Sequence, residues 1–252
     1  MFKMISKLNS VGMCAVVATG SFLLGQKYEE KIVYAKLLKN PPRFRETVSS
    51  NYVLSYNRYT RSAHWVCEHL TQDRLVRGPS VDRKLAEFLP DKFFDGRFIA
   101  KNEDYLGSGY DRGHLVAAGN HRQTQKATND TFHLSNISPQ KEMAKTAINT
   151  YILTGPLYLP REEPDGNKYV KYRVIGNNNV AVPTHFFKVL LLEKTPGKYE
   201  VEYFMLANEV HEDSNDLKNY HCTKEAIEKS AGLSIFDKLP PSSIKKINRK
   251  EV

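Results

Sequence analysis

Tyr110-Asp111-Arg112-Gly113-His114-Leu115 is the stretch of this sequence that combines a titratable base, a fixed cation and a flexible backbone. A histidine takes up a proton near neutral pH, and an arginine guanidinium matches the geometry of a phosphate. Gly113 is expected to let the backbone bend, so that His114 and Arg112 approach one phosphate together. Asp111 is expected to orient a neighbouring side chain or to shape the turn. Such a set suits hydrolysis of a phosphodiester by an activated water molecule.

The same tetrapeptide also fits a surface turn with a solvated histidine, so its context matters. The chain has 37 Lys and Arg against 28 Asp and Glu, a net charge of +9, and its pI is near 9.3. This balance favours polyanionic partners, either nucleic acid or acidic lipid. A basic composition unrelated to function is the alternative. The charge balance therefore agrees with a polyanionic substrate for the Tyr110–Leu115 stretch.

The 252 residues suffice for one large domain or two small ones. The three cysteines, Cys14, Cys67 and Cys222, form no CxxC pair. This spacing argues against a disulfide framework or a structural zinc site. Cys67 is expected to be a buried helix residue.

Residues 1–28 are expected to be a mitochondrial targeting or membrane-anchor segment. They contain lysines but no acid, and the run from Val11 to Gly25 is almost wholly apolar or small. The run is shorter than the roughly 20 residues of a spanning helix. A secretory signal is the alternative to the preferred interpretation, a presequence retained as a contact with the mitochondrial inner membrane. Residues 29–50, with Pro41-Pro42, are expected to be a linker.

Residues 51–240 are predicted to form an α+β domain around a central antiparallel sheet. Strand composition marks residues 52–56, 131–137, 151–157, 169–175, 185–192 and 201–206. Helices are expected at 63–70, capped by Ser62, and at 224–231, ended by Gly232. The irregular segment 71–110 is expected to carry functional loops. The basic tail 241–252 is expected to be loosely ordered.

The run from Tyr110 to Arg122 and its continuation resemble the DNA/RNA non-specific endonuclease family. The matching segments follow the family's order over residues 51–239. Besides the run itself they are Tyr56–Trp65, Gln125–Ala127, Asp130–Gln140, Thr154–Pro160, Tyr169–Gly176, Val180–Val189 and Ser230–Leu233. The resemblance implies a ββα-metal (His-Me finger) nuclease fold. It also implies cleavage of both DNA and RNA, with contacts mostly to phosphate and little dependence on base sequence.

The resemblance further implies roles for individual residues. His114 is the general base, and Arg112 and Arg83 stabilise charge on the phosphorane; Asp111 completes the catalytic set. Asn120, Arg122 and Lys126 are the implied nucleic-acid contacts. One Mg²⁺ or Mn²⁺ ion, held by water and an asparagine on the following helix, binds the scissile phosphate and the leaving oxygen. The implied products carry a 5′ phosphate and a 3′ hydroxyl. Relatives of this kind act as homodimers in the mitochondrial intermembrane space, with release to the nucleus.

The sequence departs from the family where the metal-bearing helix is expected. Lys141 to Ile148 is long enough for about two helical turns, contains no asparagine, and has Lys145 near the expected ligand position. A charged lysine cannot ligate Mg²⁺. Asn136 and Glu142 are the candidate substitutes for this ligand. A shortened metal helix is therefore expected, and two functions stay open: a metal-dependent endonuclease, or a catalytically weak protein that binds nucleic acid and dimerises.

Overall fold

The computed structural model of the protein describes residues 46–48, 52–140, 151–210 and 216–252. The predicted targeting segment 1–28, Glu142 and Lys145 lie outside the described residues. The chain divides into two compact units, residues 1–41 with 234–240 and residues 42–233 with 241–252. Of the first unit the structure describes residues 234–240, in which Ile235 and Phe236 are buried. The sheet and the candidate site lie in the second unit.

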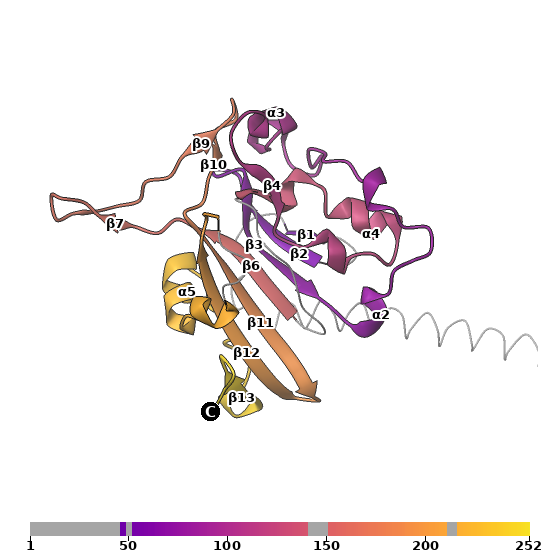
Figure 1. The fold of residues 1–252 in the computed structure, drawn as a ribbon, viewed down its shortest axis with the longest axis vertical. Coiled ribbons are helices and arrows are strands. Elements are labelled where there is room, and N and C mark those ends of the chain that lie inside the picture. The colour runs from indigo at the N-terminus through magenta and orange to yellow at the C-terminus, as the bar shows by residue number, and fades with distance from the viewer. Residues whose placement is uncertain (1–45, 49–51, 141–150, 211–215) are drawn as a thin grey trace, which may run out of the picture. The chain divides into compact units, whose positions relative to one another are not determined.

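An eight-stranded sheet forms the centre of the second unit (Figure 1). Its strand order is β1-β2-β3-β6-β11-β12-β13-β14, and every neighbouring pair is antiparallel except β12 and β13. The strands are β1 (Glu46–Val48), β2 (Tyr52–Asn57), β3 (Ser62–His69), β6 (Tyr151–Leu157), β11 (His185–Thr195), β12 (Lys198–Ala207), β13 (Ile244–Ile247) and β14 (Lys250–Glu251). The predicted antiparallel scaffold is confirmed.

Two layers cover this sheet, one on each face (Figure 1). Helix α5 (Lys224–Ala231) packs on β6 and β12 and ends at Gly232, whose φ of 67° gives the left-handed C-cap expected from the sequence. The other layer contacts β3 and contains β4 (Asp111–His114), β5 (Ile137–Gln140), the 3-10 helix η4 (Leu134–Asn136) and α4 (Gln125–Asp130). The candidate site lies in this second layer.

The remaining elements are short. The segment 71–110 contains α2 (Gln72–Leu75), η1 (Arg83–Leu85), η2 (Gly96–Phe98) and α3 (Asn102–Tyr105) between irregular stretches, as expected. Two small sheets pair β7 (Arg161–Glu162) with β8 (Lys168–Tyr169) and β9 (Val174–Ile175) with β10 (Val180–Ala181). The other 3-10 helices are η3 (Ala118–Asn120), η5 (Leu217–Tyr220) and η6 (Pro241–Ser243). Among the residues that the structure describes, no helix has the length and apolar character to cross a membrane.

The helix predicted at residues 63–70 is wrong, because this segment is strand β3. Its aromatic and β-branched residues are buried on both faces, and β2 and β6 pair with it from either side. A strand buried on both faces shows no alternation of polar and apolar residues, so its pattern resembles that of a buried helix. Cys67 is buried as expected, but in a strand. The register shifts near His64, whose ring contacts the carbonyl oxygen of Ala231 at 2.9 Å.

Four other predictions also change. The strand expected at 131–137 starts only at Ile137, after a turn and η4. The strand expected at 169–175 is divided between β8 and β9. The tail, expected to be loose, adds β13 to the sheet because Asn248 binds the backbone of Val201 and Tyr203. Strand β1 lies within the predicted linker and pairs with β2.

Candidate active site

The DRGH motif forms strand β4, which pairs with β5 so that His114 lies opposite Ile137 and Arg112 opposite Pro139. Side chains two residues apart in a strand point to the same face and lie roughly 7 Å apart. The strand therefore presents Arg112 and His114 on one face. Asp111 is exposed and alternates to the opposite face, so the structure does not bring it to this pair.

The role expected for Gly113 also changes, because its φ is not in the left-handed region and the strand does not bend there. A Cβ atom at this position would overlap Cδ and Oε1 of the Gln140 side chain and would lie 2.5 Å from its Cβ. Glycine is needed because the Gln140 side chain lies across this position. The close pairing holds His114 in place.

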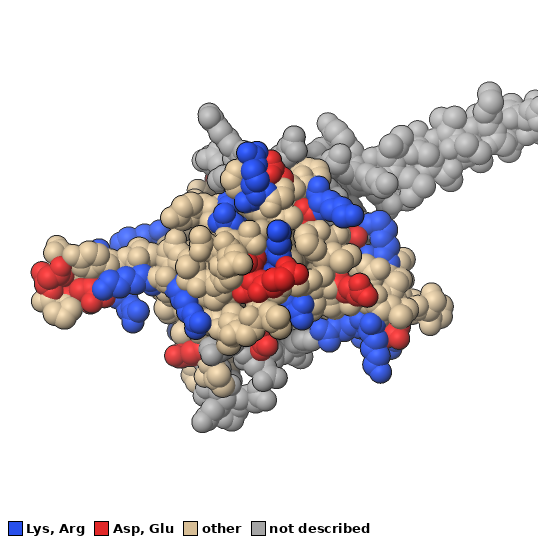
Figure 2. All heavy atoms as spheres, turned by 90° about the horizontal axis from the view of Figure 1, so that it is seen from above, with Lys and Arg blue, Asp and Glu red and all other residues tan. Residues whose placement is uncertain are grey.

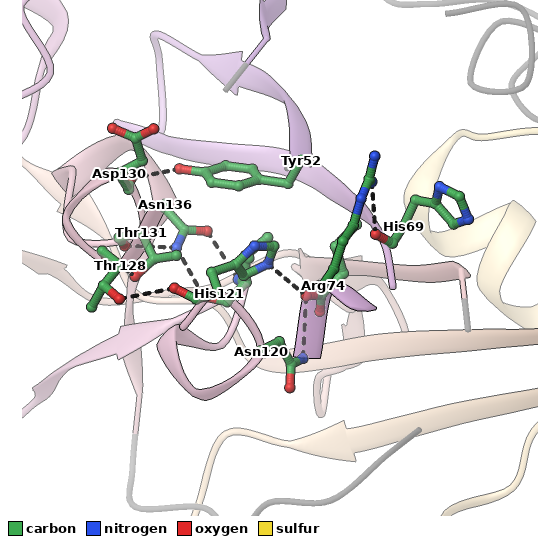
Figure 3. A network of polar contacts seen from close by, with 11 residues as sticks. Tyr52, His69, Arg74, Asn120, His121, Thr128, Asp130, Thr131 and Asn136 are labelled. Carbon is green, nitrogen blue, oxygen red and sulfur yellow. Dashed lines mark hydrogen bonds and ion pairs between the residues drawn. The ribbon is translucent and has the colours of Figure 1, made fainter. Parts of the chain in front are cut away.

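Asn136 fixes the turn that follows His114 (Figure 3). Its Oδ1 accepts a hydrogen bond from the Val116 N–H at 2.9 Å, and its Nδ2 donates to the carbonyl oxygens of Val116 and Thr131 at 3.0 and 2.8 Å. The residue is completely buried. Asn136 therefore has a structural role, in contrast to the expectation of a metal ligand.

Two phenylalanine rings surround the His114 imidazole. Its ring centroid lies 4.6 Å from that of Phe132, edge to face, and 5.4 Å from that of Phe88. The two phenylalanine rings are themselves 4.8 Å apart. Rings packed at these distances restrict the orientation of the imidazole. His114 is thus held on an aromatic wall at the end of its strand.

The same two rings support the two arginines implied for catalysis. The guanidinium carbon of Arg112 lies 4.3 Å from the Phe88 centroid, and that of Arg83 lies 5.7 Å from the Phe132 centroid. Arg112 also donates to Oδ1 of Asn102 at 2.8 Å. Both arginines are exposed, and these partners are uncharged, so the positive charges remain available to an anion. Arg83, Arg112 and His114 therefore converge around one pair of rings.

Arg83 reaches this place because the preceding residue is clamped to α4. The Gln125 side chain accepts from the Asp82 N–H at 2.8 Å and donates to the Asp82 carbonyl at 3.0 Å. The loop that carries Phe88 is joined to the Phe132 segment by two backbone hydrogen bonds of Leu89. Long-range bonds of this kind bring residues from the irregular segment to the DRGH strand.

The three residues expected to contact nucleic acid differ in their availability. The Arg122 side chain is exposed. Lys126 is exposed but forms an ion pair with Asp130 at 2.7 Å. Asn120 points inward and donates to Oε2 of Glu68 at 3.2 Å. Of the three, Arg122 is thus the one whose charge is most accessible.

A buried polar network connects the segment after His114 to the sheet (Figure 3). Oε2 of Glu68, on β3, lies 3.0 Å from Nε2 of His121, and both side chains are about 2% exposed. The His121 carbonyl accepts from the Thr128 hydroxyl at 2.9 Å, in α4. The Tyr52 hydroxyl donates to the Asp130 carbonyl at 2.7 Å. These bonds attach the layer that carries the site to strands β2 and β3.

The described residues do not assign a protein ligand to a metal ion. Within residues 46–48, 52–140, 151–210 and 216–252, no group of three His, Cys, Asp or Glu side chains is arranged to hold one. The Asn136 amide is committed to the turn, and Glu142 lies outside these ranges.

Several residues of the site had no recognisable signal in the sequence. Phe88 and Asn102 lie in the irregular segment, where no periodicity marks a side chain as buried or functional. Phe132 was expected in a strand and instead lies in a turn. Gln125 appeared only as part of the motif run. Their roles depend on contacts between distant segments.

Comparison with known proteins agrees with this geometry. The model of the DNA/RNA non-specific endonuclease family matches residues 38–147 and 141–242, and the two ranges overlap at residues 141–147, before β6. Mitochondrial endonuclease G of Caenorhabditis elegans is 54% identical over 215 residues, covering 79% of this chain and 70% of that protein. The Homo sapiens protein of the same name is 45% identical over 199 residues, covering 73% and 66%.

A solved structure gives the same result for the fold. The crystal structure of an EndoG/EndoGI complex contains a chain that superposes with a TM-score of 0.81 at 40% identity, covering 87% of this chain and 97% of the other. This similarity confirms the predicted α+β fold of the ββα-metal class. The chain belongs to the DNA/RNA non-specific endonuclease family.

Proposed function

We propose that the chain hydrolyses phosphodiester bonds in DNA and RNA with His114 as the general base. The family acts on nucleic acids and depends on a divalent metal ion. The observation that supports these residue roles is the convergence of His114, Arg112 and Arg83 around Phe88 and Phe132. A base beside two exposed arginines suits attack of water on an anionic phosphodiester.

In the proposed reaction His114 accepts a proton from the attacking water. The water oxygen forms a bond to phosphorus, and the bond from phosphorus to the 3′ oxygen breaks. The 3′ oxygen takes up a proton from solvent, which leaves a 3′ hydroxyl and a 5′ phosphate. Arg112 and Arg83 stabilise the negative charge that builds on the phosphoryl oxygens. Because these groups contact phosphate and not base edges, cleavage has little sequence preference.

The ion is proposed to be Mg²⁺ or Mn²⁺. Mg²⁺ usually keeps several water ligands and binds through one or two carboxylates or amides together with substrate phosphate. A bound divalent ion neutralises charge on phosphate oxygens. Glu142 remains a proposed ligand, whereas Asn136 is occupied by the turn.

Cleavage by the full chain tests the proposal. Plasmid DNA and a labelled RNA are incubated with Mg²⁺ or Mn²⁺, and with EDTA as the control for the ion. His114→Ala is expected to lower kcat by about 10³-fold or more, since it removes the base. His69→Ala, at the far end of β3, is the matched control and should cleave at the wild-type rate. Equal cleavage by His114→Ala would refute the role of His114.

The alternative is a protein that binds nucleic acid without cutting it. The short segment before β6 motivates this alternative, because the family's metal helix is expected there. Salt-dependent DNA binding by the wild type, with no cleavage at any ion concentration, would support it.

We further propose that the chain is a homodimer in the mitochondrial intermembrane space. The relatives at 54% and 45% identity are named mitochondrial, which supports a mitochondrial location for this chain. Residues 1–28 are proposed to contact the inner membrane, and release to the nucleus is proposed from the family resemblance. Light scattering after gel filtration tests the dimer, and protease protection in fractionated mitochondria tests the location.

A further inference from the structure

We infer that Arg173 is an additional phosphate-binding residue, which extends the substrate contact from the active site to the base of the β7–β8 hairpin. The inference rests on the proposed function, because it assumes a nucleic-acid strand at His114. The guanidinium carbon of Arg173 lies 5.4 Å from the ring centroid of Tyr110. Tyr110 is two residues before Arg112, so the ring under Arg173 directly precedes the DRGH strand.

Arg173 is held in the same way as the two site arginines. Arg83 lies over Phe132, Arg112 over Phe88, and Arg173 over Tyr110. A guanidinium that stacks on a ring keeps its N–H groups free to bind a phosphate at its edge. Arg97 shows the contrasting arrangement, because it lies over Phe98 but also pairs with Asp95 at 2.7 Å.

Arg173 carries an exposed charge. In the part of the chain that the structure describes, no carboxylate forms an ion pair with it, and its side chain is exposed. Lys171 lies one step farther along the hairpin but pairs with Glu163 at 3.0 Å. Of these two cations, Arg173 is therefore the one available to a phosphate.

The backbone of Arg173 is fixed relative to the DRGH strand. Its carbonyl accepts from the Val182 N–H at 2.8 Å, and β9 begins at the next residue. Ile175 of β9 belongs to a buried cluster that also contains Ile137, the partner of His114, and on which Tyr110 packs. This shared cluster makes Arg173 and the active site parts of one packed structure.

The charge distribution of the β7–β8 hairpin limits the nucleic-acid contact to the base of the hairpin. In Figure 2 the segment that protrudes at the left has Lys and Arg along its sides and Asp and Glu at its tip. The acids of this hairpin are Glu162, Glu163 and Asp165, and Asp165 orders the turn by accepting from Asn167 and the Tyr169 hydroxyl. An acidic tip repels a polyanion. A nucleic-acid strand that extends from the active site therefore contacts Arg173 and not the hairpin tip.

Binding of a labelled DNA duplex tests the inference. Full-length protein with His114→Ala is used, so that cleavage does not interfere, and the Kd is measured over a range of salt concentrations. Adding Arg173→Ala should raise the Kd about 3- to 10-fold and reduce the slope of log K against log salt by about 0.9, the value for one phosphate contact. The Kd of Arg173→Lys should lie between those of the His114→Ala parent and the Arg173→Ala variant, since lysine keeps the charge but lacks the planar guanidinium.

Two further variants test whether the effect depends on where the positive charge lies and how its side chain is oriented. Tyr110→Leu should weaken binding in the same direction as Arg173→Ala, because the guanidinium loses the ring that orients it. Lys229→Ala removes an exposed charge from α5, on the other face of the sheet, and should leave the Kd unchanged. With His114 intact, Arg173→Ala should raise KM by the same factor as Kd and leave kcat unchanged.

The outcomes separate this inference from the proposed function. If the wild type cleaves and His114→Ala does not, but Arg173→Ala keeps the wild-type Kd and salt slope, the inference is wrong and the proposed function stands. A fall in kcat with unchanged KM also overturns it. If the wild type does not cleave but Arg173→Ala still weakens salt-dependent binding, the proposed function fails and Arg173 remains a nucleic-acid contact.

Discussion

At the scale of single residues, the geometry of the DRGH strand depends on Gly113, which has no side chain, and on Asn136, whose amide is fully hydrogen-bonded. Gly113 permits the Gln140 side chain to cross the strand between Arg112 and His114. Asn136 uses its amide to hold the backbone beyond His114. Neither residue takes part in the proposed reaction, yet both determine the position of the His114 imidazole.

Gly113→Ala is expected to lower the free energy of unfolding by roughly 1–3 kcal/mol, because the new methyl group overlaps the Gln140 side chain. Cleavage should fall as well, since β4 must shift. Urea unfolding and plasmid cleavage measure the two effects. Gln140→Ala should not rescue the variant, because its Cβ stays 2.5 Å from the added atom, whereas Gln140→Gly should. Gly119→Ala is the control, with no atom within 4 Å of its added carbon, and an effect as large there would contradict the explanation.

At the scale of elements, the layer that carries the site is attached to the sheet by polar bonds as well as by apolar packing. Glu68 of β3 accepts from both Asn120 and His121, and Gln125 of α4 clamps the backbone before Arg83. A buried carboxylate is stable only when it is paired. The attachment therefore depends on His121, although no sequence pattern marks this histidine as structural.

His121→Ala should lower the free energy of unfolding by roughly 3–5 kcal/mol, because it leaves the Glu68 carboxylate buried without its main partner. Denaturant unfolding followed by circular dichroism measures the loss. The surface variant Lys126→Ala breaks the exposed ion pair with Asp130 and should cost less than about 1 kcal/mol. The double variant Glu68→Leu, His121→Leu should recover part of the stability. If its loss in free energy of unfolding equalled the sum of the losses of the two single variants, the result would argue against a buried pair.

At the scale of the whole molecule, the core buries several groups that ionise at high pH. Burial raises the pKa of the Cys67 thiol to about 12 and that of Tyr151 to about 12. Burial also raises the pKa of Tyr52, Tyr56, Tyr105, Tyr158 and Tyr203. Each of these groups stays protonated in the folded protein at a pH where the unfolded chain loses its proton. Burial lowers the pKa of Lys188, which contributes with the opposite sign.

Stability should therefore decrease as the pH rises from about 9 toward 12, because the folded state binds more protons than the unfolded state in this range. For Cys67 alone the loss is about 1 kcal/mol between pH ~9 and ~10. Urea unfolding at several pH values measures the slope. Cys67→Ala should make the slope shallower, and a slope unchanged by this substitution would rule out the thiol as a contributor.

The sequence by itself determined the local part of the site. Arg112 and His114 lie two residues apart, and any extended strand presents such a pair on one face. The antiparallel sheet and helix α5 were also predictable, because strand composition and the Gly232 cap are local signals. Arg83 was available only from the family resemblance, since nothing near it in the sequence points to His114.

Only the tertiary structure decided which distant residues meet at His114. Phe88 and Phe132 come from a loop and a turn whose patterns carry no functional signal, and they are brought together by the backbone bonds of Leu89. Asn136 changes from a candidate ligand to a buried structural residue for the same reason. Strand β3 was misread because burial on both faces removes the alternation that identifies a strand. Contacts between segments far apart in the chain carry no periodicity, and packing alone selects them.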